Sequence, residues 1–357
     1  MKNEDYKKIL LHKHKERKLT GEDFLSTGST VLNCACTDNP NRGFIKGHYY
    51  HIVGDSISGK TWLSLTCLAE AALNPNFDNH RFIYDNGEGG ALMNIEKYFG
   101  KAVAERIEPP AGTRSKPKYA RLLEEFYYYL ADAFETGKPF IYIKDSLDVS
   151  TSLADQELFK ENKKLFEKGR ETKNTYGMSK AKINSEYMKN VVSELGHEGQ
   201  SIVIGISQSR DNIGGFEKTN AGGHALKFYA TLQLWSSVKE KLKKTVLGKP
   251  RQTGILCQIK VKKNRVTGKE RVVTIPIYHS FGIDDIGSCV SYLIDEGHWP
   301  EKSGIITASE MNFEGKFEKF VRHIEREELE KDLRNIVGDV WNEIEEASVM
   351  NRKKRYE

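Results

Sequence analysis

Residues 54–61 read GDSISGKT, a glycine-rich run that ends in lysine and threonine. Glycines let backbone N–H groups curl around a phosphate, Lys60 can reach the β- and γ-phosphate oxygens, and the Thr61 hydroxyl can bind Mg²⁺. The run follows the apolar residues 49–53 and precedes a helical pattern from Trp62, which is the strand-to-helix setting of a phosphate loop. We expect a bound nucleoside triphosphate with Mg²⁺, held by Gly54, Asp55, Ser56, Ile57, Ser58, Gly59, Lys60 and Thr61.

A nucleotide hydrolase also needs a carboxylate on the metal side. Residues 140–144 form a buried-strand pattern that ends at Asp145, and we assign this carboxylate to Mg²⁺ together with Thr61. Asp148 is a less favoured alternative for this role. An aspartate at a strand end can also serve only to cap the next turn. A second apolar run, 201–206, leads to Gln208, whose neutral amide suits a γ-phosphate sensor at a strand end.

An acidic, glycine-rich turn follows a further strand pattern at 81–84. It reads Asp85-Asn86-Gly87-Glu88-Gly89-Gly90, and the carboxyl ends of strands are where open α/β sheets bind ligands. Glu88 can orient and deprotonate an attacking water. The alternative is a solvated turn in which the glycines provide mobility.

The elements that must position these residues follow an α/β pattern. Short β-rich runs alternate with longer amphipathic stretches, which predicts a sheet covered by helices. The last three runs lack long helices between them, so that side of the sheet should be antiparallel. The predicted strands are 49–53, 81–85, 140–144, 201–206, 231–236, 254–261 and 271–277.

Composition shifts divide the chain into an N-terminal helix and linker (1–25), a core (26–304) and a C-terminal helical region (305–357). The N-terminal helix is predicted from the apolar stripe Tyr6, Ile9 and Leu10. Residues 153–182 are polar and rich in lysine and glutamate, which predicts a mobile insertion or a solvated helix.

The C-terminal region carries an apolar stripe at three- and four-residue intervals, which predicts a packed helix. Its members are Leu329, Leu333, Ile336, Val337, Val340, Trp341 and Ile344. Upstream, Thr307 and Glu310 have the spacing of a helix capping box.

Composition narrows the class of protein. Hydrophobic residues make up 38% and charged residues 29% of the 357, which is typical of a globular protein, and the formal charge of +5 indicates mild attraction to polyanions. The five cysteines have neither zinc-site nor disulfide spacing. Without an apolar membrane-spanning stretch or signal core, we expect a cytoplasmic protein.

These residues together resemble the bacterial RecA-type recombinases. The resemblance rests on Ser26-Thr27-Gly28-Ser29, Asp145-Ser146, Gln208 with Arg210, and above all the stretch GGHALKFYA at 222–230. It runs from about Ser26 to Gly304, while the insertion and the C-terminal part look more like the phage branch of the family. His224 stands where the family has asparagine.

The resemblance implies an α/β RecA-type core and a DNA-dependent ATPase. It implies a protein that forms an ATP-bound filament on single-stranded DNA and pairs that strand with homologous double-stranded DNA in recombination and repair. In this family the nucleotide lies between protomers, and two basic residues of the neighbour reach the γ-phosphate. Lys263 and Arg265 match those positions, with arginine in place of the family's second lysine; because the two cations are not interchangeable, hydrolysis can differ in rate.

Two DNA-contacting loops are also implied by the resemblance. The second loop should bind DNA through Arg210, Asn212, Ile213, Gly214, Gly215, Phe216 and Lys218, and the first through Met178, Lys180 and Lys182. An apolar wedge between glycines suits unstacked bases, while backbone and basic groups hold phosphates. Single-strand-binding and loader proteins are further partners that the sequence does not identify.

Two alternatives stay open. A ring helicase or translocase shares the same core, and a non-catalytic, ATP-switched DNA-coating protein would result if Gly87 displaced Glu88 from the water. No adenine-stacking aromatic is evident, although Tyr98 or Phe99 can serve.

Overall fold

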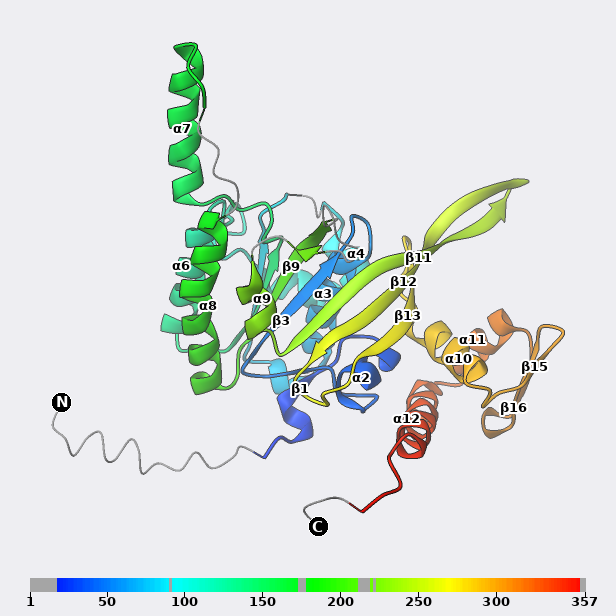
Figure 1. The fold of residues 1–357 in the computed structure, drawn as a ribbon. Coiled ribbons are helices and arrows are strands. Elements are labelled where there is room, and N and C mark those ends of the chain that lie inside the picture. Colours follow the sequence, from blue (N-terminus) through cyan, green and yellow to red (C-terminus); the bar gives the residue numbers. More distant parts are fainter. Residues whose placement is uncertain (1–17, 90–91, 173–177, 211–218, 221–222, 354–357) are drawn as a thin grey trace, which may run out of the picture.

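The structure is a computed structural model that describes residues 18–89, 92–172, 178–210, 219–220 and 223–353. Its centre is a ten-stranded sheet in the order β14-β13-β12-β11-β3-β9-β8-β4-β5, with β10 paired to β9 (Figure 1). The strands are β3 His48–Gly54, β4 Arg81–Asn86, β5 Ile107–Glu108, β8 Phe140–Asp145, β9 Ile202–Arg210, β10 Thr219–Asn220, β11 Leu232–Val246, β12 Lys249–Asn264, β13 Arg271–Tyr278 and β14 Gly282–Ile283.

The strand pairing confirms the predicted fold class. All contacts from β11 through β3, β9, β8 and β4 to β5 are parallel, whereas β11, β12, β13 and β14 pair antiparallel. All seven predicted strands are present. The chain therefore has a mainly parallel α/β core with an antiparallel extension.

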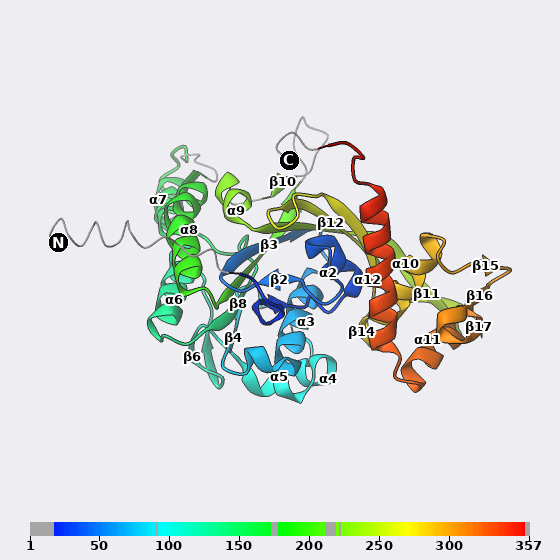
Figure 2. The same cartoon turned by 90° about the horizontal axis from the view of Figure 1, so that it is seen from below.

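Helices cover both faces because alternate side chains of the central strands are apolar on both sides. Tyr50 and Ile52 pack on the face that carries α2 (Thr30–Thr37), α3 (Lys60–Leu73), α4 (Ile95–Phe99) and α5 (Lys101–Arg106). Tyr49 and Tyr142 pack on the other face, against α6 (Leu123–Glu135), α8 (Met178–Glu198) and α9 (His224–Tyr229) (Figure 2). Such two-sided burial is what makes these strands continuous apolar runs in the sequence.

Two elements project from the body (Figure 1). Helix α7 (Leu153–Glu167) has no buried residue, so this part of the predicted insertion is a solvated helix. On the other side, β11 and β12 continue as a two-stranded ribbon as far as the pair Val246 and Lys249. Leu247 and Gly248 close the ribbon with φ of 52° and 73°, the positive values that a tight hairpin turn requires.

The C-terminal part packs on the core. It comprises α10 (Asp285–Asp295), a small sheet of β15 (Glu301–Lys302), β16 (Ile305–Ala308) and β17 (Phe313–Gly315), then α11 (Phe317–Arg326) and α12 (Glu330–Ala347). Leu333, Val337, Val340 and Trp341 of α12 are buried in the same apolar cluster as α2, which confirms the predicted packing stripe. The small sheet includes strands on both sides of residue 304, the predicted end of the core. The division of the chain into three regions stays a prediction.

The predicted capping box is wrong. Thr307 lies in β16, and Glu310 belongs to a short 3₁₀ helix, Ser309–Met311. Its carboxylate instead accepts hydrogen bonds from His298 Nε2 (2.7 Å) and Trp299 Nε1 (3.0 Å). The Glu310 carboxylate therefore makes tertiary contacts and does not cap a helix.

The remaining short elements are η1 (Gly21–Asp23), β1 (Phe24–Leu25), β2 (Phe44–Ile45), η2 (Pro75–Phe77), β6 (Ala111–Thr113) and β7 (Lys116–Lys118). Within the described residues, no helix combines the length and apolarity needed to cross a lipid bilayer. The predicted helix around Tyr6, Ile9 and Leu10 lies outside the described residues.

Candidate nucleotide site at the carboxyl edge of the sheet

The register of the central strands brings the predicted nucleotide residues to one edge. In the parallel pair β3 and β9, Gly54 lies opposite Gln208, and in the pair β4 and β8, Asn86 lies opposite Asp145. The phosphate loop, Asp145, the turn of Glu88 and Gln208 therefore share the carboxyl edge, where α/β sheets bind ligands.

The phosphate loop has the backbone that its glycines predict. A side chain at Gly54 would come within 2.3 Å of Ser236 O, and Gly59 has φ of 88° with Ile277 only 2.5 Å from the place of a Cβ. Ser58 Oγ donates to Asp55 O at 2.8 Å. The loop is therefore held closely against β11 and β13 by contacts that larger residues would break.

Lys60 lies across this loop. Its Nζ donates to Gly54 O (3.0 Å) and Asp55 O (2.5 Å). Burial lowers the pKa of the Lys60 ammonium, and the carboxylates of Asp145 and Glu88 oppose that shift. An anionic phosphate would strengthen the charged form in the same way.

Thr61 and Asp145 form the candidate Mg²⁺ position. Thr61 Oγ1 donates to Asp145 Oδ2 at 2.7 Å, and Tyr84 OH donates to the same oxygen at 3.0 Å. Burial raises the pKa of Asp145, against the lowering effect of these two hydrogen bonds. One hydroxyl and one carboxylate, completed by water and phosphate, fit the oxygen ligands that Mg²⁺ takes in nucleotide sites.

No group of three His, Cys, Asp or Glu side chains capable of holding a metal occurs in the part of the chain that the structure describes.

Glu88 and Gln208 meet at this edge. Glu88 Oε1 accepts hydrogen bonds from Ser146 Oγ (2.5 Å) and Gln208 Nε2 (3.3 Å). The backbone N–H of Gln208 donates to Asp148 Oδ2 at 2.6 Å, so Asp148 holds the end of β9. The candidate water-orienting carboxylate and the candidate γ-phosphate sensor therefore touch directly.

Sequence reasoning missed three residues of this site. Tyr84 and Ser146 bond to the two functional carboxylates, and Ser209 Oγ donates to Asp55 Oδ1 in the phosphate loop. Strand alternation could have identified Tyr84, because it places Tyr84 on the same face as Asp145, whereas Ser209 depends on contact between β9 and a loop 154 residues away.

Aromatic residues lie beside the start of α3. The Trp62 ring meets Tyr98 at a centroid distance of 5.1 Å and Phe99 at 5.2 Å. Together with Phe281 they line a cavity of about 440 Å³ that includes Glu70 and Arg334. Phe99 is buried, Trp62 and Tyr98 are half-buried, and Phe281 is exposed.

The structure does not bring Lys263 and Arg265 to this edge. Lys263 pairs with Gln233, which lies opposite His51, three residues before Gly54 along β3. This offset is about 10 Å along the strands. Both cations lie away from the phosphate loop of their own protomer.

Lys263 and Arg265 instead contact the end of α9. Lys263 Nζ donates to Lys227 O (2.7 Å) and Phe228 O (2.6 Å), and Arg265 Nη2 donates to Phe228 O (2.7 Å). Burial, followed by the charges of Arg265 and Lys227, lowers the pKa of Lys263 to about 8. Both cations thus meet the negative end of a helix backbone.

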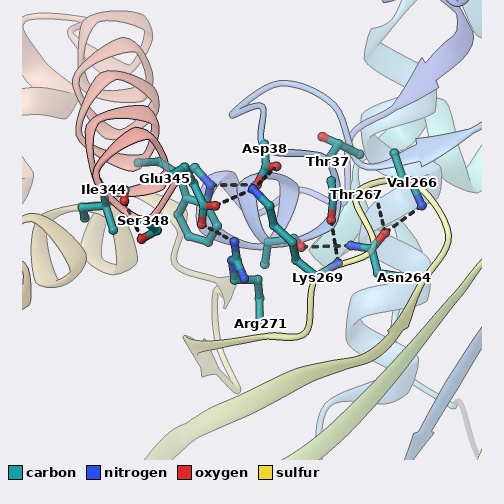
Figure 3. Close-up of polar contacts among 12 residues, drawn as sticks. Thr37, Asp38, Asn264, Val266, Thr267, Lys269, Arg271, Ile344, Glu345 and Ser348 are labelled. Carbon is teal, nitrogen blue, oxygen red and sulfur yellow. Dashed lines mark hydrogen bonds and ion pairs between the residues drawn. The ribbon is translucent and has the colours of Figure 1, made fainter. Parts of the chain in front are cut away.

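A network of polar contacts braces the turn that carries these cations (Figure 3). Asn264 Oδ1 accepts from Val266 N (2.8 Å) and Thr267 N (2.9 Å), and its Nδ2 donates to Cys36 O of α2 (3.0 Å). Farther along, Lys269 and Arg271 both pair with Glu345 of α12. Lys269 also pairs with Asp38 at 3.1 Å, so α2 and α12 fix the turn from two sides.

A buried histidine links the strands beneath Gln208. His51 Nε2 lies 3.0 Å from Ser207 Oγ, and His51 Nδ1 lies 3.1 Å from Gln233 Nε2. Burial lowers the pKa of His51 to about 3, so the ring is neutral at pH 7. A neutral ring can accept from the Gln233 amide and donate to the Ser207 hydroxyl.

The predicted DNA residues are only partly covered by the structure. Asn212, Ile213, Gly214, Gly215, Phe216 and Lys218 lie outside the described residues, as do the side chains of Met178 and Arg210. Lys180 Nζ donates to Asp148 O at 3.3 Å, and Lys182 forms an exposed ion pair with Glu186 at 3.9 Å. Lys180 thus lies beside the residue that holds Gln208.

The projecting ribbon of β11 and β12 forms a basic surface. Residues 239–251 contain six exposed cations and one carboxylate, Glu240. No ion pair joins these cations to an acidic side chain among the described residues, and Lys244 lies directly opposite Arg251 across the ribbon. Like charges placed opposite each other cost stability, which a polyanion would offset. The cations are Lys239, Lys241, Lys243, Lys244, Lys249 and Arg251.

Comparison with known proteins gives consistent matches. Residues 167–284 match the RecA N-terminal domain family. The chain is 27% identical over 278 residues to Protein RecA of Cytophaga hutchinsonii, an alignment that covers 76% of this chain and 69% of that protein. It is 26% identical to Protein RecA of Prochlorococcus marinus over 285 residues (78% and 66% covered) and to that of Trichodesmium erythraeum over 321 residues (84% and 79%). The sheet order and the phosphate loop at the carboxyl edge fit a RecA-type core, and the chain is similar in sequence to these RecA proteins.

Proposed function

We propose that this chain is an ATP-dependent recombinase. It assembles as a filament on single-stranded DNA, pairs that strand with homologous duplex and hydrolyses ATP when DNA is bound. The observation that carries the proposal is the contact of Glu88 with Gln208 beside Thr61 and Asp145, within a RecA-type fold. Gln208 is also the residue from which the predicted DNA loop begins.

In this proposal Lys60 and the loop amides hold the β- and γ-phosphates. Thr61 and Asp145 hold Mg²⁺, which neutralises phosphate charge when bound. Glu88 accepts a proton from water as the water oxygen attacks the γ-phosphorus, and the bond from phosphorus to the β,γ-bridging oxygen breaks. Ser146 fixes the carboxylate of Glu88 by its 2.5 Å hydrogen bond.

The arrangement of the cations favours a site shared between protomers. Lys263 lies about 10 Å along the strands from its own phosphate loop and Arg265 lies farther away, so a neighbour's γ-phosphate is the partner that we assign to them. A repeating head-to-tail contact of this kind generates a filament or a ring.

The coupling of ATP to DNA passes through Gln208. A γ-phosphate that competes for its amide changes the contact with Glu88 and the start of the DNA loop, and hence changes DNA affinity. The basic ribbon supplies a further surface for phosphates. The proposal places the protein in the cytoplasm of a bacterium or of a phage-infected cell.

Joint-molecule formation tests the proposal. Single strands are mixed with homologous or heterologous duplex, with ATP or a nonhydrolysable analogue. We expect joint molecules only with the homologous duplex, with either nucleotide, because hydrolysis serves release and not pairing. Unwinding of a forked duplex by closed rings, without a homology-dependent product, would support the helicase alternative instead.

A Glu88→Gln variant separates catalysis from coating. We expect it to retain nucleotide and DNA binding and to lose DNA-stimulated phosphate release by about 100-fold or more, since a general base is removed. An unchanged rate of phosphate release would exclude Glu88 from the mechanism and favour the DNA-coating alternative.

A further inference from the structure

A buried ion pair lies directly behind the turn that carries Glu88. Lys144 Nζ is 3.1 Å from Asp85 Oδ2, and both side chains are fully inaccessible to solvent. The two residues lie opposite each other in the parallel pair of β8 and β4. They face α6, the side of the sheet opposite to Asp145 and Thr61.

The pair holds the chain that enters α6. Asp85 Oδ1 accepts from Ala120 N at 3.0 Å, and Lys144 Nζ donates to Ala120 O at 2.9 Å. Tyr142 OH donates to Asp85 Oδ2 at 2.9 Å. Both backbone polar groups of Ala120 are thus satisfied by the two members of the pair.

The turn of Glu88 rests on this assembly. A Cβ at Gly87 would lie 2.7 Å from Lys144 Nζ and 3.3 Å from Ala120 O, so a larger residue would displace the Lys144 ammonium. The turn is closed by Gly87 N to Asp85 O at 3.0 Å and Gly89 N to Asn86 O at 3.1 Å. Glu88 N donates in turn to Asp145 O at 3.3 Å, which ties the turn to the metal-side strand.

Stability alone does not explain such a pair. Desolvating two charges costs about as much as their attraction returns, and apolar replacements of similar size are often neutral or stabilising. What a bonded pair adds is a defined geometry for the groups that it touches. Here those groups are Ala120 and Gly87, the residue before Glu88.

We infer that Asp85 and Lys144 are positioning residues that hold the turn of Glu88 in register with Asp145 and Ser146. The inference rests on the proposed role of Glu88 and deepens it. Lys144 acts from the far face of the sheet and touches neither nucleotide nor water.

The test uses the full-length protein with Lys144→Met, the pair-neutral Asp85→Asn/Lys144→Met and Gly87→Ala. The matched control is Lys46→Met, because Lys46 is also a buried lysine whose Nζ donates to a backbone carbonyl, Asn76 O at 2.9 Å, away from Glu88. ATP affinity, DNA-stimulated kcat and thermal unfolding are measured for each protein.

We expect kcat to fall by about tenfold or more in the three test variants, with the KM for ATP within about twofold of wild type, because transition-state positioning is lost and binding is kept. Gly87→Ala should add little on the Lys144→Met background, since both changes act through one contact. A pair-neutral variant with wild-type unfolding temperature and wild-type kcat would overturn the inference.

Hydrogen exchange gives a readout that needs no hydrolysis. Exchange of the Glu88 and Gly89 amides should accelerate by about tenfold or more in the pair-neutral variant and in Gly87→Ala, but not in Lys46→Met. Unchanged exchange would contradict the inference even if the protein were no ATPase. Normal exchange with an inactive Glu88→Gln variant would leave the proposed function intact while refuting the role of Lys144.

Discussion

At the scale of single residues, the carboxyl edge of the sheet is made of side chains that share hydrogen-bond partners. Asp145 accepts from Thr61 and Tyr84, and Glu88 accepts from Ser146 and Gln208. Each carboxylate is therefore oriented by two donors, and both donors come from other elements of the fold. The protonation state and the orientation of these carboxylates depend on burial as much as on residue type.

If Lys263 contacts a neighbour's γ-phosphate as proposed, hydrolysis should depend on pH. The Lys263 pKa of about 8 means that the ammonium loses its proton as pH rises through 8, so kcat/KM at low ATP should fall there. Arginine stays charged, and Lys263→Arg should remove this alkaline fall. Because the folded pKa lies below the unfolded value of 10.5, this residue's contribution to stability rises between pH 8 and 10.5, so unfolding does not mimic the effect.

His51 should make the fold sensitive to acid. Its pKa is about 3 in the folded chain and 6.5 unfolded, so the unfolded state binds more protons between these values and stability falls as pH drops below 6.5. Between pH 7 and 5 this is about 2 kcal/mol. His51→Gln should flatten the fall in urea midpoints, while His80, with a pKa of about 4, leaves a residual slope. An equal fall in wild type and His51→Gln would contradict the account.

At the scale of elements, two features of the antiparallel side carry clustered charge. The ribbon of β11 and β12 projects into solvent with six cations, and the turn between β12 and β13 is braced by α2 and α12 (Figures 1 and 3). The ribbon suits contact with a polyanion, and the braced turn fixes the positions of Lys263 and Arg265.

Neutralising the ribbon should weaken DNA binding through its salt dependence. Lys243→Gln/Lys244→Gln/Arg251→Gln should lower the slope of log affinity against log salt for duplex DNA by about two to three, because each phosphate contact contributes close to one. ATPase activity without DNA should be unchanged. The control Lys116→Gln/Lys118→Gln/Lys138→Gln removes three exposed cations elsewhere. Equal slopes in the two variants would show that the ribbon does not contact DNA.

Loosening the brace should reduce hydrolysis without affecting ATP binding. Glu345→Gln removes the partner of Lys269 and Arg271, and we expect kcat to fall by about threefold to tenfold as the turn loses its orientation. Glu346→Gln, an exposed neighbour on the same helix, is the control. A fall in both variants would point to the helix as a whole and not to the brace.

The sequence predicts the secondary-structure elements of this protein better than the contacts between distant residues. The strands and the phosphate loop are predictable because apolar runs and local glycine spacing determine them. The pair of Asp85 and Lys144 is not, because it depends on the register of two strands 59 residues apart. The prediction of a capping box at Thr307 was wrong because Glu310 binds His298 and Trp299. These residues lie outside the four-residue window that defines a capping box.

At the scale of the whole molecule, the proposed function divides the nucleotide site into two halves that lie at different places on one protomer. The phosphate loop, Asp145, Glu88 and Gln208 lie at the carboxyl edge of the sheet, and Lys263 with Arg265 lie at the end of α9. If hydrolysis needs both halves, an isolated protomer should be nearly inert. The repeated contact that joins the halves would then also build the filament.

Mixing two defective proteins tests this central claim most directly. Lys60→Ala lacks the phosphate-loop lysine, and Lys263→Ala/Arg265→Ala lacks the neighbour's cations. In an equal mixture, random assembly places intact halves together at about a quarter of the interfaces, because each half is intact with a chance of about one half. The mixture should therefore regain about a quarter of wild-type DNA-stimulated hydrolysis, whereas Lys60→Ala mixed with Glu88→Gln should stay inactive. A mixture of the first pair that stays as inactive as its components would contradict a site shared between protomers.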